Sequence, residues 1–509
     1  MLNRRAIASC IAAAMVLSGC GGKDDNNGPA NAGSGGPISG GAGGSGAAAA
    51  GAGGMAPVAG AAAAGGSGGA AGTTAGTTAG TAGTAGMTGG TAGTTGGTGG
   101  AGGTGGMAGA AGGGGSGGAP DDGPLNMAPV TFEPNVRIGA GFEVFMEVTS
   151  EGLIFVGWVQ GRSCAFSVSK DGGLTWSEPL LAGTQASGGG AFAGDTTVGI
   201  DDAGNLYAVC QDYASGGLGT NYIMLAHSKD DGETWSDFVR VNQSLDKPWI
   251  GGTGDGTVLL TWLGRPGGMK RSTDYGATWE DTISLGYINH GTTVSYATAT
   301  GLVHVAYNTG EDTVTYRRSD DLGATFEEAR NLADQGYPCR SPCSPRSHPI
   351  VGAGADPTGQ VVAITWASDL NHPDAEGDDD VWVIVSYDSG DTFTDPIRVN
   401  DNMNASRQFQ PWAAVDKYGG VHVVWTDLRD GGENATYYAR MTDVEAGFEA
   451  NVEVTDDTGR PASFLGDYKG IEVDGRDIVV TWADTRDGPS TIYFARAVDA
   501  AAAGGPLMK

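Results

Sequence analysis

The sequence of 509 residues has few positive charges and few histidines. It contains 28 Lys and Arg against 58 Asp and Glu, giving a formal net charge of −30. This acidity argues against nucleic acid and against an anionic bilayer surface as partners. The six histidines show no HExxH or other paired spacing. No glycine-rich loop follows a strand and opens a helix, so metalloprotease and nucleotide-binding functions are unsupported.

Beyond the first 20 residues, no apolar run is long enough to span a bilayer. The chain starts with two arginines, an apolar stretch and then Leu-Ser-Gly-Cys at residues 17–20, which is typical of a bacterial secretory signal ending in a lipobox. Its similarity to bacterial lipoproteins implies a signal peptide at 1–19 and lipidation of Cys20. We therefore expect an exported protein, held at the outer membrane or cell surface by this lipid only. The alternative is an ordinary signal peptide with a chance cysteine.

Large apolar side chains are nearly absent from residues 21 to 120, which are mostly Gly, Ala, Thr and Ser. Such a composition cannot offset the entropy lost on ordering, so we expect residues 20–120 to be a disordered linker. A flexible chain of that length has a root-mean-square span of roughly 50–60 Å. The folded domain is expected at 121–500, followed by a tail at 501–509.

A repeated eight-residue pattern organises the folded domain. SKDGGLTW at Ser169–Trp176 returns as SKDDGETW, STDYGATW, SDDLGATF and SYDSGDTF, beginning at residues 228, 272, 319 and 386. In each copy the Asp can accept backbone hydrogen bonds, the Gly can take a positive φ, and the aromatic side chain can fill the gap below the turn. The pattern thus predicts five turns, each between two strands.

This frame, Ser-x-Asp-x-Gly-x-Thr-aromatic, is the Asp-box or BNR repeat, so residues 128–500 resemble the sialidase-like β-propellers. The resemblance implies a structural role for the five repeat aspartates, Asp171, Asp230, Asp274, Asp321 and Asp388. We predict an all-β fold of seven four-stranded blades, with the segment 130–138 supplying the outer strand of the seventh. Closing the ring in this way would leave no open sheet edge. Six blades are the alternative, because sialidases of the family have six.

Four cysteines remain for the exported domain. Cys339 and Cys343 in the string CRSPC are expected to form one disulfide within a loop, and Cys164 and Cys210 to pair between neighbouring blades. A CxxxC metal site is the alternative for the first pair, although no second ligand pair stands nearby.

Polar residues at the starts of the innermost strands are the candidate ligand site, because these starts share one face of a propeller around its central channel. They are Glu143, Asp195, Lys247 with Trp249, His290, Arg346 with His348, Arg407 with Gln410, and Asp467 with Tyr468. Each blade contributes to one mouth, which indicates a ligand site. Solvated loop ends would give a weaker version of the same pattern.

Two similar loops, WTDLRDG and WADTRDG, place Arg429 and Arg486 on that same face. An arginine fork suits a planar carboxylate because it donates two parallel hydrogen bonds. In the alternative interpretation each arginine pairs with its own neighbouring aspartate, Asp427 or Asp484.

The resemblance to sialidases implies three arginines on the substrate carboxylate, a tyrosine nucleophile and an aspartate acid/base. Here Arg346, Arg407 and either Arg429 or Arg486 would form the arginine triad. Tyr468 would be the nucleophile and Asp195 the acid/base.

An acidic string in the fifth blade offers hard oxygen ligands for calcium. Its carboxylates are Asp374, Glu376, Asp378, Asp379 and Asp380. A solvated hairpin loop is the alternative, and no other cofactor or metal is expected.

Three functions remain open at this point. The first is recognition of an extracellular ligand at the channel mouth, with glycans favoured by the resemblance and Trp249 as an exposed aromatic contact. The second is a retaining glycosidase acting on an acidic sugar such as sialic acid. The third is a scaffold that docks protein partners. In each case we expect a monomer.

Overall fold

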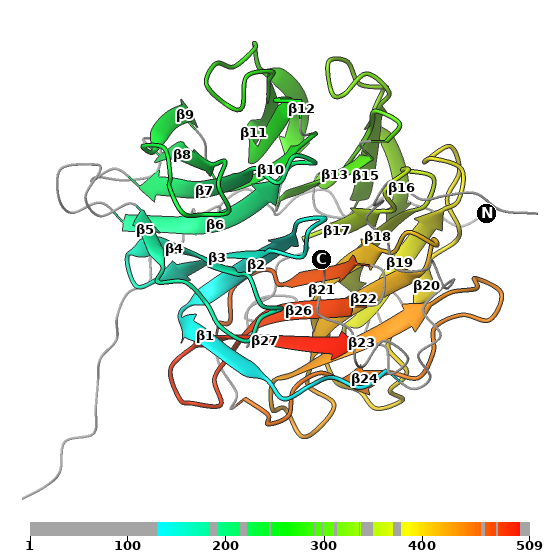
Figure 1. The fold of residues 1–509 in the computed structure, drawn as a ribbon. Helices are drawn as coiled ribbons and strands as arrows, with labels where there is room; N and C mark the ends of the chain where they lie inside the picture. Colours follow the sequence, from blue (N-terminus) through cyan, green and yellow to red (C-terminus); the bar gives the residue numbers. More distant parts are fainter. Residues whose placement is uncertain are drawn as a thin grey trace, which may run out of the picture. The chain divides into compact units, whose positions relative to one another are not determined.

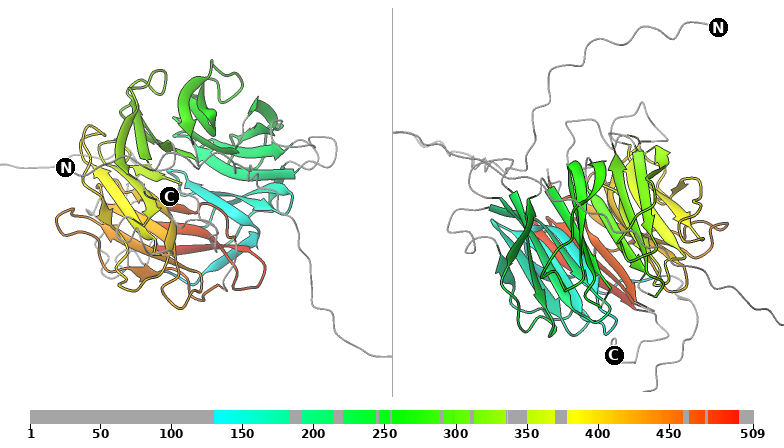
Figure 2. Two further views of the ribbon diagram at one scale, coloured as in Figure 1. Left: turned by 180° about the vertical axis from the view of Figure 1, so that it is seen from behind. Right: turned by 90° about the horizontal axis from the view of Figure 1, so that it is seen from above.

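The computed structural model describes residues 130–498, except for 183–191, 214–220, 244–245, 254, 289–290, 298, 310–312, 335, 337–349, 370–377, 460–463 and 475–476. These described residues form strands and turns, and none belongs to a helix long and apolar enough to span a bilayer. Seven sheets stand around a common axis (Figure 1), and the edge-on view shows them as blades lying side by side (Figure 2). The seven-bladed propeller is confirmed, and the six-bladed alternative is wrong.

The first four blades follow one another along the chain, and every sheet is antiparallel. Blade 1 contains β2 (Phe142–Val148), β3 (Ile154–Gln160), β4 (Ser163–Ser169) and β5 (Leu180–Ala182). Blade 2 contains β6 (Phe192–Ile200), β7 (Leu206–Tyr213), β8 (Asn221–Ser228) and β9 (Val239–Gln243). Blade 3 contains β10 (Asp246–Gly252), β11 (Val258–Ser272) and β12 (Ile283–Ile288). Blade 4 contains β13 (Thr292–Ala297), β14 (Leu302–Thr309), β15 (Thr313–Ser319) and β16 (Arg330–Asp334).

The last three blades complete the ring. Blade 5 contains β17 (Gly352–Ala355), β18 (Val362–Ser368), β19 (Asp380–Ser386) and β20 (Ile397–Arg398). Blade 6 contains β21 (Gln408–Val415), β22 (Val421–Asp427), β23 (Ala435–Met441) and β24 (Val452–Glu453). Blade 7 contains β25 (Gly470–Asp474), β26 (Asp477–Asp484), β27 (Thr491–Val498) and, at its outer edge, β1 (Val136–Ala140).

Blade 7 is closed by the N-terminal strand, as the sequence predicts. β1 runs antiparallel to β27, with Val136 opposite Phe494, and Phe132 forms a further bridge to Ala497. Blade 3 differs from the predicted four strands. Its β11 combines the second and third strands, because residues 258–263 pair with β10 and residues 264–269 pair with β12.

The core lies between the blades. The second strand of five blades carries a tryptophan with at most 5% of its surface exposed: Trp158, Trp262, Trp366, Trp425 and Trp482. These strands have two buried faces because each blade packs against both of its neighbours. This explains their nearly continuous apolar sequences.

Each of the five repeated turns forms the same set of hydrogen bonds. In the first, Asp171 accepts bonds from the Thr175 amide at 2.9 Å and the Thr175 hydroxyl at 2.6 Å. The Ser169 hydroxyl donates to the same carboxylate at 2.9 Å and accepts from the Gly173 amide at 2.8 Å. Corresponding bonds are formed at the turns around Asp230, Asp274, Asp321 and Asp388.

Each of the five turns also packs against the blade that precedes its own. Trp176 of the first turn packs edge-on against Phe494 of blade 7, with 5.6 Å between ring centroids. Gly173 has a φ of 90°, and a Cβ there would lie 2.0 Å from the Phe494 ring. Glycine is therefore required for two reasons, namely the left-handed backbone and the close approach.

Blades 1 and 2 are also joined covalently. Cys164 of β4 and Cys210 of β7 form a disulfide with 6.0 Å between their Cα atoms. This is the inter-blade pairing that the sequence analysis gives for these two residues. Cys339 and Cys343 lie outside the described residues.

Candidate functional site

A β-bulge begins the innermost strand of four blades and presents a polar residue to the channel. The residues are Glu143, Asp195, Lys247 and Gln410, and their φ angles are 54°, 46°, 45° and 54°. The strand register shifts at each of these points. Left-handed backbone at residues other than glycine is strained and concentrates at functional sites. Four such residues at equivalent positions mark this end of the channel as the candidate site.

These residues belong to a group that we call the charged cluster, made up of Glu143, Asp195, Asp246, Lys247, Gln410 and Asp467. Lys247 lies at its centre. Its Nζ atom is 2.7 Å from Oδ2 of Asp467 and 3.2 Å from Oδ1 of Asp195, and the lysine side chain is 3% exposed. The Tyr213 hydroxyl donates a hydrogen bond to the other oxygen of Asp195. The Gln410 amide donates to the Gly466 carbonyl, which fixes the start of blade 7. The cluster thus draws residues from five blades.

The carboxyl groups of the cluster have opposed pKa shifts. Burial, with the nearby Asp195 charge, raises the pKa of Glu143 well above its ordinary value. Burial and the nearby Asp195 charge also raise the pKa of Asp246 well above its ordinary value. Burial acts to raise the pKa of Asp195 too, but Lys247 and the hydrogen bonds outweigh it, so this pKa is lowered. One site therefore holds carboxyl groups whose pKa values are shifted in opposite directions.

Two buried polar side chains next to the cluster have no hydrogen-bond partner among the described residues. They are the hydroxyl of Thr196 and the whole side-chain amide of Gln211, and both residues are 0% exposed. Buried polar groups are nearly always paired, because an unpaired one costs about 1–3 kcal/mol. The sequence analysis missed Gln211 because it lies in β7, a second strand, where a strand-start pattern gives no signal.

Tyr468 lies below the cluster and is 3% exposed. Its hydroxyl donates to the Thr196 carbonyl at 2.9 Å. Burial raises its pKa well above the usual value, and the charge of Glu143 adds to this effect. The structure therefore brings a glutamate from blade 1 near the tyrosine that the sequence analysis names as nucleophile. In this structure, however, the hydroxyl is bound to backbone.

Trp249 is buried, contrary to the expected exposed contact. It stacks on Trp412 with 5.0 Å between centroids and meets Phe145 at 4.9 Å and Tyr468 at 5.2 Å, both edge-on. Because these rings come from blades 3, 6, 1 and 7, they close the channel. We call these four residues the aromatic plug.

Lys469 was also missed from the sequence. It is 2% exposed and donates to the hydroxyls of Thr426 and Thr436 at 2.7 and 3.3 Å. Burial lowers its pKa to about 7, although Asp484 and Asp427 act to raise it. The segment 467–469 therefore binds three other blades, because its neighbours Asp467 and Tyr468 reach blades 3 and 2.

The arginines do not converge on the cluster. Arg429 donates to its own Asp427 from Nε and Nη2, at 3.0 and 2.8 Å, and to Asp401 from Nη1 at 2.7 Å. Arg486 is bound in the same way by Asp484 and, at 2.5 Å, by Asp456.

Arg429 and Arg486 are thus each bound by the aspartate of their own loop, as in the alternative interpretation of the two loop motifs, and by a second aspartate from another segment. Arg407 likewise contacts Asp379 at 2.9 Å. Arg346, His290 and His348 lie outside the described residues. The expected triad of Arg346, Arg407 and either Arg429 or Arg486 therefore stays a prediction, since Arg346 is not described, but its described members are each bound by aspartates.

Two aspartates of the proposed calcium string are bound to arginines. Asp379 pairs with Arg407, and Asp380 pairs with Arg398 at 2.7 Å. Among the described residues, no group of three or more His, Cys, Asp and Glu is arranged to hold a metal ion. Asp374 and Glu376 lie outside the described residues, as does Cys20.

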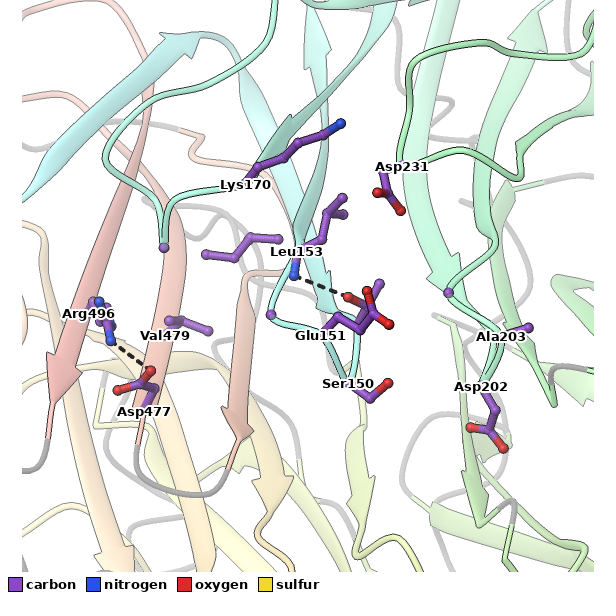
Figure 3. Close-up of a pocket in the computed structure, with 15 residues that line it drawn as sticks. Ser150, Glu151, Leu153, Lys170, Asp202, Ala203, Asp231, Asp477, Val479 and Arg496 are labelled. Atoms are coloured by element: carbon purple, nitrogen blue, oxygen red, sulfur yellow. Dashed lines mark hydrogen bonds and ion pairs between the residues drawn. The ribbon is translucent and has the colours of Figure 1, made fainter. Parts of the chain in front are cut away.

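A polar crevice of about 230 Å³ opens where blades 7, 1 and 2 meet at the repeated turns (Figure 3). Lys170 and Asp231 of two repeated turns stand at one end, and Arg496 is paired with Asp477 at 2.7 Å on the far wall. Its charges are of both signs, and it lies away from the charged cluster.

No protein-family model and no curated protein matches this chain. Solved structures do match. The Hadza microbial sialidase Hz136 is 16% identical with a TM-score of 0.41, covering 70% of this chain and 66% of that one. The α-L-arabinofuranosidase Arb93A from Fusarium graminearum is 12% identical with a TM-score of 0.43, covering 74% and 99%. A PL25 ulvan lyase bound to -[GlcA(1-4)Rha3S]- is 14% identical with a TM-score of 0.46, covering 72% and 96%.

The chain matches just under two thirds of the length of that sialidase. At such low identities the similarities concern the fold alone.

Proposed function

We propose that this propeller binds a neutral glycan at the charged cluster. The observation that carries the proposal is the set of four strained bulges, which direct Glu143, Asp195, Lys247 and Gln410 toward one end of the channel. Carboxylate, ammonium and amide groups together match the mixed donors and acceptors of sugar hydroxyls. The unpaired amide of Gln211 offers a further donor and acceptor beside them.

A neutral sugar fits this site better than an acidic one. The cluster holds the carboxyl groups of Glu143, Asp195, Asp246 and Asp467 around Lys247, and Arg407, Arg429 and Arg486 are bound by other aspartates. An anionic substrate would meet this excess of carboxyl oxygens, and none of these three guanidiniums is available to bind its carboxylate. This changes the expected substrate class from sialic acid to uncharged sugars.

Hydrolysis of the bound glycan is the second candidate function, and the opposed pKa shifts favour it. Glu143 and Asp246, whose pKa values are raised, would donate a proton to a leaving oxygen. Asp195, whose pKa is lowered, would act as the base or nucleophile. Groups whose pKa values are driven apart within one site are the usual acid and base of glycosidases.

The test is a glycan array followed by hydrolysis assays on each bound glycan, using the full-length chain. We expect binding of neutral oligosaccharides and not of sialosides. If the protein is also an enzyme, Asp195→Asn should lower the rate by roughly 10²–10⁴-fold, as expected for an acid–base group. The exposed Asp237→Asn serves as the matched control and should change neither binding nor rate.

The outcomes separate the two functions. Binding without hydrolysis of any bound glycan would leave a recognition protein. Preferential binding of sialosides would overturn the neutral-sugar proposal, and binding of no glycan at all would overturn both functions.

We also propose that lipidation of Cys20 holds the propeller at the cell surface. The proposal is supported by the basic start, apolar run and lipobox of residues 1–20. When both chains are produced in a bacterial host, the wild-type chain should fractionate with membranes, whereas Cys20→Ser should be recovered in soluble form. Equal recovery of both chains in the soluble fraction would contradict lipid anchoring.

A further inference from the structure

The inner strand of blade 1 passes from one end of the channel to the other. Its alternate residues Glu143, Phe145 and Glu147 belong, in turn, to the charged cluster, the aromatic plug and a cavity beyond the plug. At about 3.3 Å per residue, Glu143 and Glu147 are separated by roughly 13 Å along the strand. The plug thus divides the channel, and Glu147 faces a compartment distinct from the proposed glycan site.

This second compartment is a cavity of about 310 Å³ lined by the inner strands of all seven blades. Its described lining includes four acidic residues, Glu147 of β2, Glu472 of β25, and Asp201 and Asp202 after β6, and contains no lysine, arginine or histidine. The charge of this lining is therefore of one sign. The volume of the cavity is at the lower end of the range for small-molecule sites.

The two glutamates lie close together on neighbouring blades. Burial raises the pKa of Glu147 well above its usual value, and the charge of Glu472 raises it further. Two carboxylates in this position repel each other, and a cation between them would remove that repulsion. The same two residues therefore favour a positively charged occupant.

The cavity has an aromatic base and walls that combine aliphatic with polar residues. The base is the stacked pair Trp249 and Trp412, and the walls include Ile200 and Val415 as well as Asp201, Asp202 and Ser295. Calcium takes six to eight oxygen ligands. Asp201, however, already accepts hydrogen bonds from Ala203, Asn205 and Tyr207, and the described residues form no group of three or more His, Cys, Asp and Glu arranged to hold a metal ion. An organic cation fits better because its carbon body can contact the indoles while its ammonium group meets the carboxylates.

We propose that the closed end of the channel binds a small amphiphilic organic cation, with its ammonium group at Glu147 and Glu472 and its apolar part against Trp249 and Trp412. The site is separate from the glycan site and does not depend on the proposed function. The aromatic plug is the wall between the two compartments. An occupant of this cavity would therefore contact rings that also lie next to the charged cluster.

Isothermal titration of the full-length chain with hexylammonium chloride tests this proposal, with hexan-1-ol as the uncharged ligand of equal length. We expect saturable binding of one hexylammonium per chain and no matching binding of the alcohol. Glu147→Gln and Glu472→Gln should each weaken binding by roughly tenfold or more, because each removes one carboxylate from a partly buried charge contact. The exposed Glu178→Gln makes the same charge change elsewhere and should have no effect.

Several outcomes would overturn the proposal. These are equal binding of hexan-1-ol, equal losses in the Glu178 control, absence of any saturable binding, or displacement of hexylammonium by equimolar Ca²⁺. The comparison of amine with alcohol on the wild-type chain remains decisive even where a variant folds poorly. Asp195→Asn should leave hexylammonium binding unchanged, so failure of the glycan proposal and failure of this one are distinguishable.

Discussion

Replacing Lys247 with methionine is expected to lower the free energy of unfolding by about 3–5 kcal/mol, the usual cost of breaking a buried ion pair from one side. Methionine keeps most of the volume but removes the charge that contacts Asp195 and Asp467. Those carboxylates, with Glu143 and Asp246 beside them, would remain buried without a counter-charge. Denaturant titration of wild-type and variant chains measures the loss.

The loss should grow as the pH rises. Without Lys247 the pKa values of Glu143 and Asp246 rise further above their unfolded values of about 4, and Asp195 loses the charge that does most to lower its pKa. A group whose pKa is raised by folding favours the folded state while it is protonated, and that contribution disappears as the pH passes through the folded pKa. The variant should therefore lose more stability near pH 8 than near pH 5.

Lys170→Met is the matched control for Lys247. Lys170 pairs with Glu233 at 2.6 Å, but its side chain is 46% exposed. Solvent-exposed pairs of this kind contribute only about 0–1 kcal/mol. Equal destabilisation by the two substitutions, or a Lys247→Met loss that does not change with pH, would show that the buried cluster is not held by charge.

Trp412→Ala is the second substitution with a large expected effect, about 3–5 kcal/mol. Trp412 is 4% exposed, and its ring contacts Trp249 and Phe145 at centroid distances of 5.0 and 5.3 Å. Removing it opens a cavity in the aromatic plug, because the surrounding strands belong to different blades and cannot collapse fully into the space. Thermal and denaturant unfolding both report the loss.

Trp412→Phe keeps an aromatic ring at the same position and should lose clearly less stability. The two variants together separate ring packing from a general effect of substitution in β21. A loss below about 1 kcal/mol for the alanine variant would mean that the plug is not a unit of the core, since such losses are typical of surface positions. The same variant also connects the two compartments of the channel, so it should change hexylammonium binding as well.

The architecture could be predicted from the sequence, because the fold repeats a local unit. Five copies of one turn, with Asp171 and its equivalents accepting hydrogen bonds from residues only four positions away, specify where each third strand ends. The closing strand near Val136 was predictable for a similar reason, since blade 7 lacked one strand and the N-terminal segment resembled the missing one. Both features could be predicted from local hydrogen bonds and from the number of strands in each blade.

The contacts of the polar residues, in contrast, could not be predicted from the sequence. Arg429 and Lys247 have the same charge and both belong to the predicted mouth, yet one is bound by its own loop and the other by blades 2 and 7. The sequence alone predicts Trp249 as a surface aromatic residue, but in the structure rings from three other blades pack against it. Glu147 and Glu472 are 325 positions apart in the sequence, and only ring closure brings their charges together. Such contacts depend on blade order and side-chain direction across the channel, which a linear pattern does not contain.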